Sequence, residues 1–463
     1  MTTASPEFPV LANAPLSAEA AAVATGPAAH PLHPAHTPTG QLSFGVFFQG
    51  VNSSTIWRLP ESGDQVAWES FEALARAAER GKFAAFFLGE GLRLREHRGV
   101  PFELDVAGRP DAQTLLAALA GVTDRIGLVA TQNTTYNDPV DLARRLQTLD
   151  LLSGGRAGWN IVTTDNAWTG ENFRRGGYLD HADRYTHAEA FVDVAAQYWR
   201  GERIAHDGAH YSVRAQGDLP RSAQGRPVLF QAGSSEPGKQ LAAKYAEAIF
   251  TAQPTVEEAR QFYADVKARV RQHGRDPDRV HILPGLSAII GGTEEEARRI
   301  QRRLEDLTVP DYGLEQLSRI VGYRVGRDDL DRRLQFGSDD PPAIHMQSRY
   351  ALVRRLVSTE NLTVRELLLR LSGGRGDRVF AGTPEQVADT IEEWFTTGAA
   401  DGFNLIPPAL PSSLTAFVDH VVPELQRRGL FRTEYTGTTL RDHLGLPRPR
   451  NRFTTGRPVA AAS

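Results

Sequence analysis

Beyond Gln41 the sequence alternates between short apolar runs and amphipathic helical patterns, and no other feature constrains the fold as strongly. Several runs are apolar at nearly every position, as expected for parallel strands that are covered on both faces. The runs predict strands within Leu42–Phe48, Phe83–Gly89, Ile126–Thr131, Ala157–Thr163, Pro227–Gly233, Ala246–Ala252, His281–Ile290 and Gly402–Pro408.

The segments between these runs have the periodicity and the end signals of helices. Ser70–Gly81 is apolar along one face and ends in a glycine of the kind that caps helices. Pro139–Gly155 begins with a proline in its first turn, and Thr383–Gly402 begins with a threonine cap. About eight strands, each followed by a helix, is the number that closes a (β/α)8 barrel, or TIM barrel.

A doubly wound open sheet is the alternative architecture. It would be favoured by a glycine-rich turn after the first strand, where the chain instead reads FFQGVNSSTIW (Phe47–Trp57). This stretch lacks the G-x-G-x-x-G pattern of dinucleotide-binding folds. The sequence therefore favours the barrel.

The expected domain organisation is one barrel over residues 41–445 with a tail at each end. Residues 1–40 are rich in Ala, Pro and Thr, and they lack the basic start and apolar core of a secretory signal, so we expect a disordered tail. Residues 446–463 are expected to form a C-terminal tail. An arginine-rich, mainly helical insertion is predicted at about 294–378, between strands seven and eight. It can serve as a lid over a site or as a contact between subunits, and both interpretations stay open.

Composition excludes several classes of function. A formal net charge of -4 gives no general attraction to nucleic acid or to an anionic membrane. No apolar run reaches the length of about 18 residues that a membrane-spanning helix needs. The chain has no cysteine, which excludes disulfides and thiolate chemistry and fits a cytoplasmic enzyme. Prolines separate His30, His33 and His36, so no metal site is expected there.

In a barrel of this kind, active residues lie at the carboxyl ends of the strands and in the loops that follow them. Paired carboxyl groups for glycoside hydrolysis and ligand clusters for metal-assisted hydrolysis are not evident at these positions. A neutral rim rich in amides instead suits a large heterocycle with donors and acceptors on its edge. The candidates selected by this rule are Glu90, Thr131, Asn133, Asn160, Ser234 and Ser235.

A second candidate site lies at the start of HADRYTHAEAFVDVAAQYW, the predicted helix His181–Trp199. A helix N-terminus that carries the side chains of His181, Arg184 and Tyr185 suits a phosphate group. The two serines of GSSEPG precede another helix and offer a second set of donors. Each set alone fits ordinary helix capping, but two sets on neighbouring strands favour a bound phosphate.

Several aromatic side chains near the strand ends are candidates for apolar walls of a site. They are Phe47, Trp159, Trp168 and Phe173, with core packing the favoured interpretation for Phe47 and Trp159. His187, one turn past Arg184, is expected at the surface or in a cap.

Several motifs, taken in order, make the chain resemble a known family. GWNIVTT, ENF, HADRY and AEAFVDVAAQYW are followed by GRPVLFQAGSSEPG and, near the C-terminus, by TLRDHLGLPRPRNRF. From about Leu42 to Phe453 the chain resembles flavin-dependent monooxygenases of the nitrilotriacetate, pristinamycin and dibenzothiophene-sulfone type. These belong to the wider group of bacterial-luciferase-like barrels.

The resemblance implies a two-component enzyme and a set of phosphate ligands. A separate NAD(P)H-dependent flavin reductase would supply reduced FMN, which forms a C4a-(hydro)peroxide with O2 and inserts one oxygen atom into a small organic substrate. The enzyme is expected to be a homo-oligomer, a dimer or a tetramer. By motif, the phosphate ligands would be His181, Tyr185, Ser234 and, chiefly, Ser235.

The resemblance also assigns residues to the flavin ring. Asn160 would face the pyrimidine edge of the isoalloxazine and is the candidate catalytic residue, while Thr131 and Asn133 would form a wall of the site. Glu90 stands where many members of the family have Asp. Two alternatives remain: a deazaflavin-dependent oxidoreductase that reacts without O2, and a flavin-binding barrel without catalytic activity.

Overall fold

The computed structural model describes residues 40–48, 59–92, 96–97, 100–101, 108–163, 172–173, 181–307, 310–336, 347–372 and 378–449. The chain divides into two units, Met1–Ala35 and His36–Ser463, and every described residue belongs to the second. Most residues of the two expected tails therefore lie outside the described part of the chain.

Eight parallel strands form a closed barrel in the order β1, β2, β5, β6, β9, β10, β11 and β13, and β13 pairs with β1 to complete the ring. Each strand lies within its predicted run, except that β5 continues past Thr131 to Asn133. The predicted (β/α)8 barrel is confirmed. The strands are β1 (Ser43–Phe48), β2 (Ala85–Leu88), β5 (Gly127–Asn133), β6 (Ala157–Val162), β9 (Val228–Gln231), β10 (Ala248–Thr251), β11 (His281–Ile290) and β13 (Gly402–Leu405).

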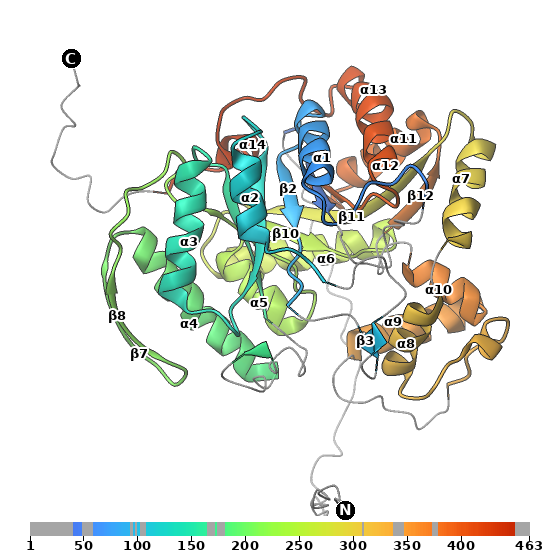
Figure 1. The fold of residues 1–463 in the computed structure, drawn as a ribbon, viewed down its shortest axis with the longest axis horizontal. Coiled ribbons are helices and arrows are strands. Elements are labelled where there is room, and N and C mark those ends of the chain that lie inside the picture. The colour runs from blue at the N-terminus through green and yellow to red at the C-terminus, as the bar shows by residue number, and fades with distance from the viewer. Residues whose placement is uncertain are drawn as a thin grey trace, which may run out of the picture. The chain divides into compact units, whose positions relative to one another are not determined.

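Helices follow the strands around the barrel (Figure 1). Their ends obey the expected signals: Gly81 caps α1, Pro139 opens α3, and the Thr383 hydroxyl caps α11 by accepting from the backbone N–H of Gln386. The helices are α1 (Trp68–Arg80), α2 (Ala112–Ala120), α3 (Pro139–Leu152), α4 (His181–Trp199), α5 (Glu236–Tyr245), α6 (Val256–Gln272), α7 (Glu294–Asp306), α8 (Pro310–Val321), α9 (Gln347–Glu360), α10 (Val364–Ser372), α11 (Pro384–Thr396), α12 (Ser412–Ala416), α13 (Val422–Arg427) and α14 (Leu440–His443), with short 3-10 turns at Pro277–Arg279 and Arg327–Asp329 and a π-helical turn at Phe417–Val421.

The described part of the segment between β11 and β13 contains five α-helices, α7 to α11, and one strand that was not predicted. Helices α8, α9 and α10 share an apolar core that includes Leu317, Val353 and Leu367, and they form a group of their own in Figure 1. The chain then forms β12 (Arg378–Gly382), which pairs with the C-terminal half of β11. The run RVFAG is short and follows a stretch rich in glycine and arginine, so its periodicity carried no strand signal.

Two hairpins outside the barrel were also not predicted. They are β3 (Glu96–His97) with β4 (Val100–Pro101), and β7 (Arg203–Asp207) with β8 (Ser212–Gln216). The second extends beyond α3 and α4 at the periphery (Figure 1). Its residues are largely exposed, so its strands lack the apolar runs that mark the barrel strands.

The C-terminal segment closes the end of the barrel at which the strands begin. Leu440, Leu444 and Leu446 belong to the apolar cluster inside the barrel, together with Val129. A Cβ atom on Gly127 would lie only 2.5 Å from Leu440 Cδ1 and 2.7 Å from the backbone oxygen of Ala84. Glycine at the start of β5 therefore leaves the space that Leu440 fills.

His443 in this segment makes folding sensitive to acid. Its Nε2 donates to the backbone oxygen of Arg125 at 2.7 Å, and burial lowers the pKa of the imidazole to about 4. In the unfolded chain the His443 imidazole titrates near pH 6.5. Between about pH 6.5 and 4 the unfolded state therefore binds a proton at His443 that the folded state does not. Stability should fall by about 3 kcal/mol as the pH drops through this window.

Urea unfolding at several pH values, compared with His443→Gln, measures this contribution. The variant should show a flatter profile between pH 6.5 and 4. Burial also lowers the pKa of His281, whose ring bonds the Leu444 carbonyl, so some acid sensitivity should remain in the variant. Identical slopes for the two proteins would contradict the assignment.

Candidate active site

Asn160 lies inside the barrel beside Thr131. A Cβ on Gly158, two residues earlier on β6, would meet side chains of the interior cluster, and alternation along the strand puts Asn160 on the same face. Thr131 of β5 is its partner in the sheet register, and Asn160 Nδ2 donates to the Thr131 hydroxyl at 3.1 Å.

Among the described residues, the other end of the same carboxamide has no partner. Asn160 is only 4% exposed, and its Oδ1 is buried without a hydrogen bond from any described residue. A buried acceptor left in this state costs about 1–3 kcal/mol, which a donor from a bound ligand or a water molecule would offset. The amide is held by Thr131 in an orientation that leaves the oxygen available.

Glu90 and Asn133 form a second pair where β2 and β5 end. Asn133 Nδ2 donates to Glu90 Oε2 at 2.9 Å, while Asn133 Oδ1 accepts from the backbone N–H of Tyr136 at 2.7 Å. These two bonds define which end of the amide is nitrogen. Burial raises the pKa of Glu90 to about 7, and the hydrogen bond from Asn133 opposes this only in part.

Tyr185 and Ser235 form a third pair, which joins two separate helix starts. Their hydroxyl oxygens lie 3.1 Å apart, and Ser235 Oγ also accepts from the Gly238 backbone N–H as the N-cap of α5. Ser234 is exposed next to this cap. His181 is the first residue of α4, but its side chain lies outside the described part of the chain. The structure thus brings together one residue from each candidate phosphate set, Tyr185 and Ser235.

The aromatic candidates separate into wall and core. Trp159 faces the helices outside the barrel, and its Nε1 donates to the Gln132 backbone oxygen at 3.0 Å, so the core interpretation is confirmed. Phe47 packs against the cluster inside the barrel, as expected for core packing. Phe173 stacks on Tyr136, with ring centroids 4.3 Å apart. Tyr136 follows Asn133 by three residues. Trp168 lies outside the described residues.

The expectation for His187 was wrong. The residue is 4% exposed, and its ring packs against His210 and Tyr211 beside the β7–β8 hairpin. The helical pattern around His187 placed it correctly on α4. Its burial results from the hairpin, which packs over that face of the helix and was not predicted.

Arg109 was not recognised from the sequence. Its Nη1 donates to the backbone oxygen of Glu90 at 3.1 Å, and its side chain fills the space beside Gly89 and Gly91, where a Cβ would come within 3 Å of it. Glycines on both sides of Glu90, in LGEG, were the available signal for a close approach of this kind. Arg109 thus contacts the backbone of the loop that carries Glu90.

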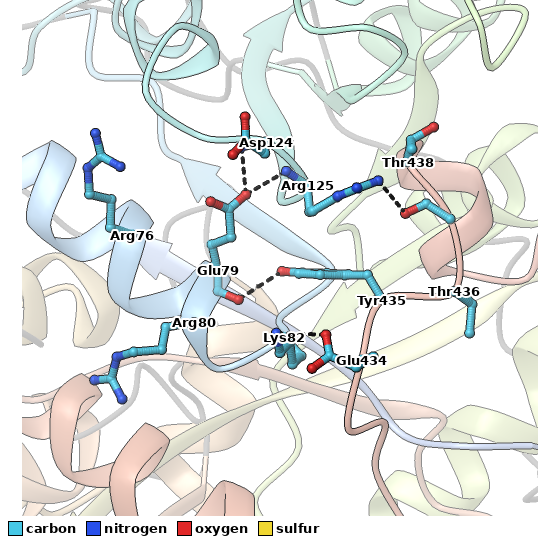
Figure 2. Close-up of a pocket in the computed structure, with 11 residues that line it drawn as sticks. Arg76, Glu79, Arg80, Lys82, Asp124, Arg125, Glu434, Tyr435, Thr436 and Thr438 are labelled. Atoms are coloured by element: carbon cyan, nitrogen blue, oxygen red, sulfur yellow. Dashed lines mark hydrogen bonds and ion pairs between the residues drawn. The ribbon is translucent and has the colours of Figure 1, made fainter.

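A pocket of about 920 Å³ lies near the N-terminal ends of β2 and β5, away from the three pairs (Figure 2). The Glu79 carboxylate accepts from the backbone N–H groups of Asp124 and Ile126, both at 2.9 Å. Lys82 Nζ lies 3.0 Å from Glu434 Oε2, and both residues line the pocket side by side (Figure 2). The Lys82–Glu434 pair and the bond from the Tyr435 hydroxyl to the Phe83 backbone oxygen attach the chain around residue 435 to the barrel, and no predicted site residue lines the pocket.

Metal ligands and membrane-spanning helices are two further features on which the described residues bear. No group of three His, Cys, Asp or Glu side chains is arranged to hold a metal ion there. Within the same part of the chain, every helix is too short or too polar to span a membrane.

Comparison with known proteins identifies the family to which this chain belongs. The family model described as luciferase-like monooxygenase matches residues 42–401. Nitrilotriacetate monooxygenase component A of Aminobacter aminovorans is 43% identical over 89% of this chain and 98% of its own length. One subunit of pristinamycin IIA synthase, from Streptomyces pristinaespiralis, is 44% identical over 85% of this chain and 93% of its own length.

Solved structures agree with these relatives. EDTA monooxygenase from Chelativorans sp. BNC1 superposes with a TM-score of 0.71 at 32% identity, over 88% of this chain and 99% of that one. The deazaflavin alternative is not favoured, because the relatives at this level of identity are monooxygenases. The chain therefore belongs to the luciferase-like monooxygenases and is a flavin-dependent enzyme of that family.

Proposed function

We propose that this enzyme binds reduced FMN at the carboxyl ends of its barrel strands and uses it with O2 to oxygenate a small organic substrate. The reduced flavin supplies two electrons, so that one atom of O2 enters the substrate and the other leaves as water. The observation that carries the proposal is Asn160 Oδ1, a buried acceptor without a donor among the described residues. A ring N–H on the pyrimidine edge of a flavin is a donor of the required kind.

Each of the three pairs binds a different part of the cofactor. Thr131 orients the Asn160 carboxamide toward the ring, and Asn133 with Glu90 lines its wall. Tyr185 and Ser235, with Ser234 and His181 nearby in sequence, hold the phosphate at the start of two helices, where backbone N–H groups favour an anion.

The insertion at 294–378 is proposed to act as a lid. Arg355 of α9 pairs with Glu258 in the first turn of α6, with one of the two contacts at 3.3 Å. Helix α6 follows β10 and therefore begins at the carboxyl end of the barrel, so this pair joins the insertion to the rim of the site. Exclusion of water above a reduced flavin protects its reaction with O2.

The reductase is proposed to be a separate protein. One relative is named as a component of its enzyme and another as a subunit, and both names support a division of the reaction between proteins. A NAD(P)H-dependent flavin reductase in the cytoplasm would deliver reduced FMN to this chain.

An anaerobic titration with reduced FMN tests the function. We expect saturable binding near one equivalent per chain, and oxygen consumption only when O2, reduced FMN and an oxidisable substrate are present together. Absence of saturable binding would overturn the proposal. Reduced FMN that turns over substrate equally well without O2 would point to the deazaflavin type of chemistry instead.

Asn160→Ala should weaken the binding of FMN about tenfold, since one buried hydrogen bond contributes about 1–2 kcal/mol. Gln147→Ala is the matched control, because Gln147 is also a buried carboxamide whose oxygen has no partner among the described residues, but it lies on α3 outside the barrel. Fluorescence titration measures both. Equal affinities for Asn160→Ala and the wild type would remove Asn160 from the site.

His181→Ala combined with Tyr185→Phe should act through the phosphate alone. We expect FMN to bind at least about tenfold more weakly, from the loss of charge-assisted hydrogen bonds, and riboflavin to change less than about twofold. Tyr198→Phe removes another phenol from the same helix, one that donates to Asp218, and should leave both affinities unchanged. Equal losses for FMN and riboflavin would show that the pair does not bind the phosphate.

A further inference from the structure

The hydrogen bond that holds the Glu90 carboxyl group engages one of its two oxygens and leaves the other open to a proton. Among the described residues its hydrogen-bond partner is Asn133, a neutral residue, whose side-chain nitrogen lies 2.9 Å from Glu90 Oε2. Arg109 Nη1 donates to the backbone oxygen of Glu90 at 3.1 Å.

The charges that face Glu90 from neighbouring elements oppose one another. Asp111, the N-cap of α2, raises the pKa of Glu90 through its negative charge, and Arg145 of α3 lowers it. Arg145 is itself engaged by Asp141, with Nε and Oδ2 2.9 Å apart. Burial is the largest influence and raises the pKa to about 7, so both protonation states are accessible near neutral pH.

The position of the proton follows from Asn133. Because Asn133 Oδ1 accepts from the Tyr136 backbone N–H, the amide can present only its nitrogen to Glu90. Glu90 Oε2 must then act as an acceptor, and a proton bound by the carboxyl group resides on Oε1. Neutral Glu90 thus has one oxygen occupied and one O–H group able to donate.

Given the proposed function, we propose that Glu90 takes up a proton from solvent when reduced FMN binds. Reduced flavin is an anion when its N1 is deprotonated, and a carboxylate in the same partly buried site would repel it. Protonation of Glu90 removes this repulsion and supplies a hydrogen-bond donor beside the ring. Oxidised FMN has a neutral ring and requires no such uptake.

Proton uptake is measured by calorimetric titration of reduced and oxidised FMN in buffers of different ionisation enthalpy. At pH 8 we expect an uptake approaching one proton per reduced FMN and much less for oxidised FMN. The Kd for reduced FMN should rise about tenfold for each pH unit above the pKa that Glu90 has in the enzyme without flavin. Glu90→Gln should bind reduced FMN with a Kd that depends far less on pH.

Two comparisons separate this inference from its alternatives. Any proton bound by flavin N1 itself remains in Glu90→Gln, so the difference between wild type and variant isolates Glu90. Glu72→Gln on α1, which removes an acid paired with Arg76 at the surface, should behave as the wild type. If reduced FMN binds with equal proton uptake in wild type and Glu90→Gln, this inference fails. If the wild type does not bind reduced FMN, the proposed function fails instead.

Discussion

Glu247→Ala should destabilise the folded protein by about 3–5 kcal/mol, the range found when one partner of a buried ion pair is removed. The Glu247 carboxylate bonds Arg441 at 2.6 and 3.1 Å and Arg226 at 3.0 and 3.1 Å, and it accepts from the Leu229 backbone N–H at 3.1 Å. Burial alone would raise the pKa of Glu247, but the two guanidinium groups outweigh it and lower the pKa to about 2. Alanine at position 247 would leave Arg226 and Arg441 without their counter-ion.

A surface pair provides the control for this prediction. Asp207 and Arg214 form an ion pair in the β7–β8 hairpin, with side chains 63% and 61% exposed. Asp207→Ala should therefore cost far less stability than Glu247→Ala. Urea unfolding with linear extrapolation gives both values. Similar losses in the two variants would mean that the Glu247 cluster does not secure the C-terminal segment.

Gly402→Ala should destabilise the protein by at least about 3 kcal/mol, since a strained backbone and an overpacked contact each cost about 1–3 kcal/mol. Gly402 opens β13 with φ of 156°, a region that residues with a Cβ avoid. A Cβ there would lie 1.9 Å from the backbone oxygen of Ser43, its partner on β1. Backbone cannot rotate away as a side chain can, so the strand pair that closes the barrel would have to separate.

Gly322→Ala distinguishes the two causes. Gly322 has φ of 81°, but a Cβ at this position meets nothing within 4 Å. The control should therefore show only the conformational cost, about 1–2 kcal/mol. If the two variants lose the same stability, the contact between Gly402 and Ser43 contributes nothing and the strain is purely local.

Much of the fold could be predicted because its signals are local. The eight barrel strands were found since each is buried on both faces and is therefore apolar at successive positions. Strands β12, β7 and β8 lack that signal, because they pair at the edge of the barrel or outside it. The rule that active residues follow parallel strands then selected Glu90, Thr131, Asn133 and Asn160 without any knowledge of contacts.

The sequence by itself determined the barrel, the order of its elements, the family and the set of residues at the strand ends. Only the tertiary structure decided how those residues pair: Thr131 with Asn160, Glu90 with Asn133, and Tyr185 with Ser235. It also decided that His187 is buried and that Arg441 pairs with Glu247, which lies 194 residues earlier in the sequence. The physical reason is that helix and strand periodicity depends on neighbours in the chain, whereas hydrogen bonds between side chains depend on which strands and loops the closed sheet brings together.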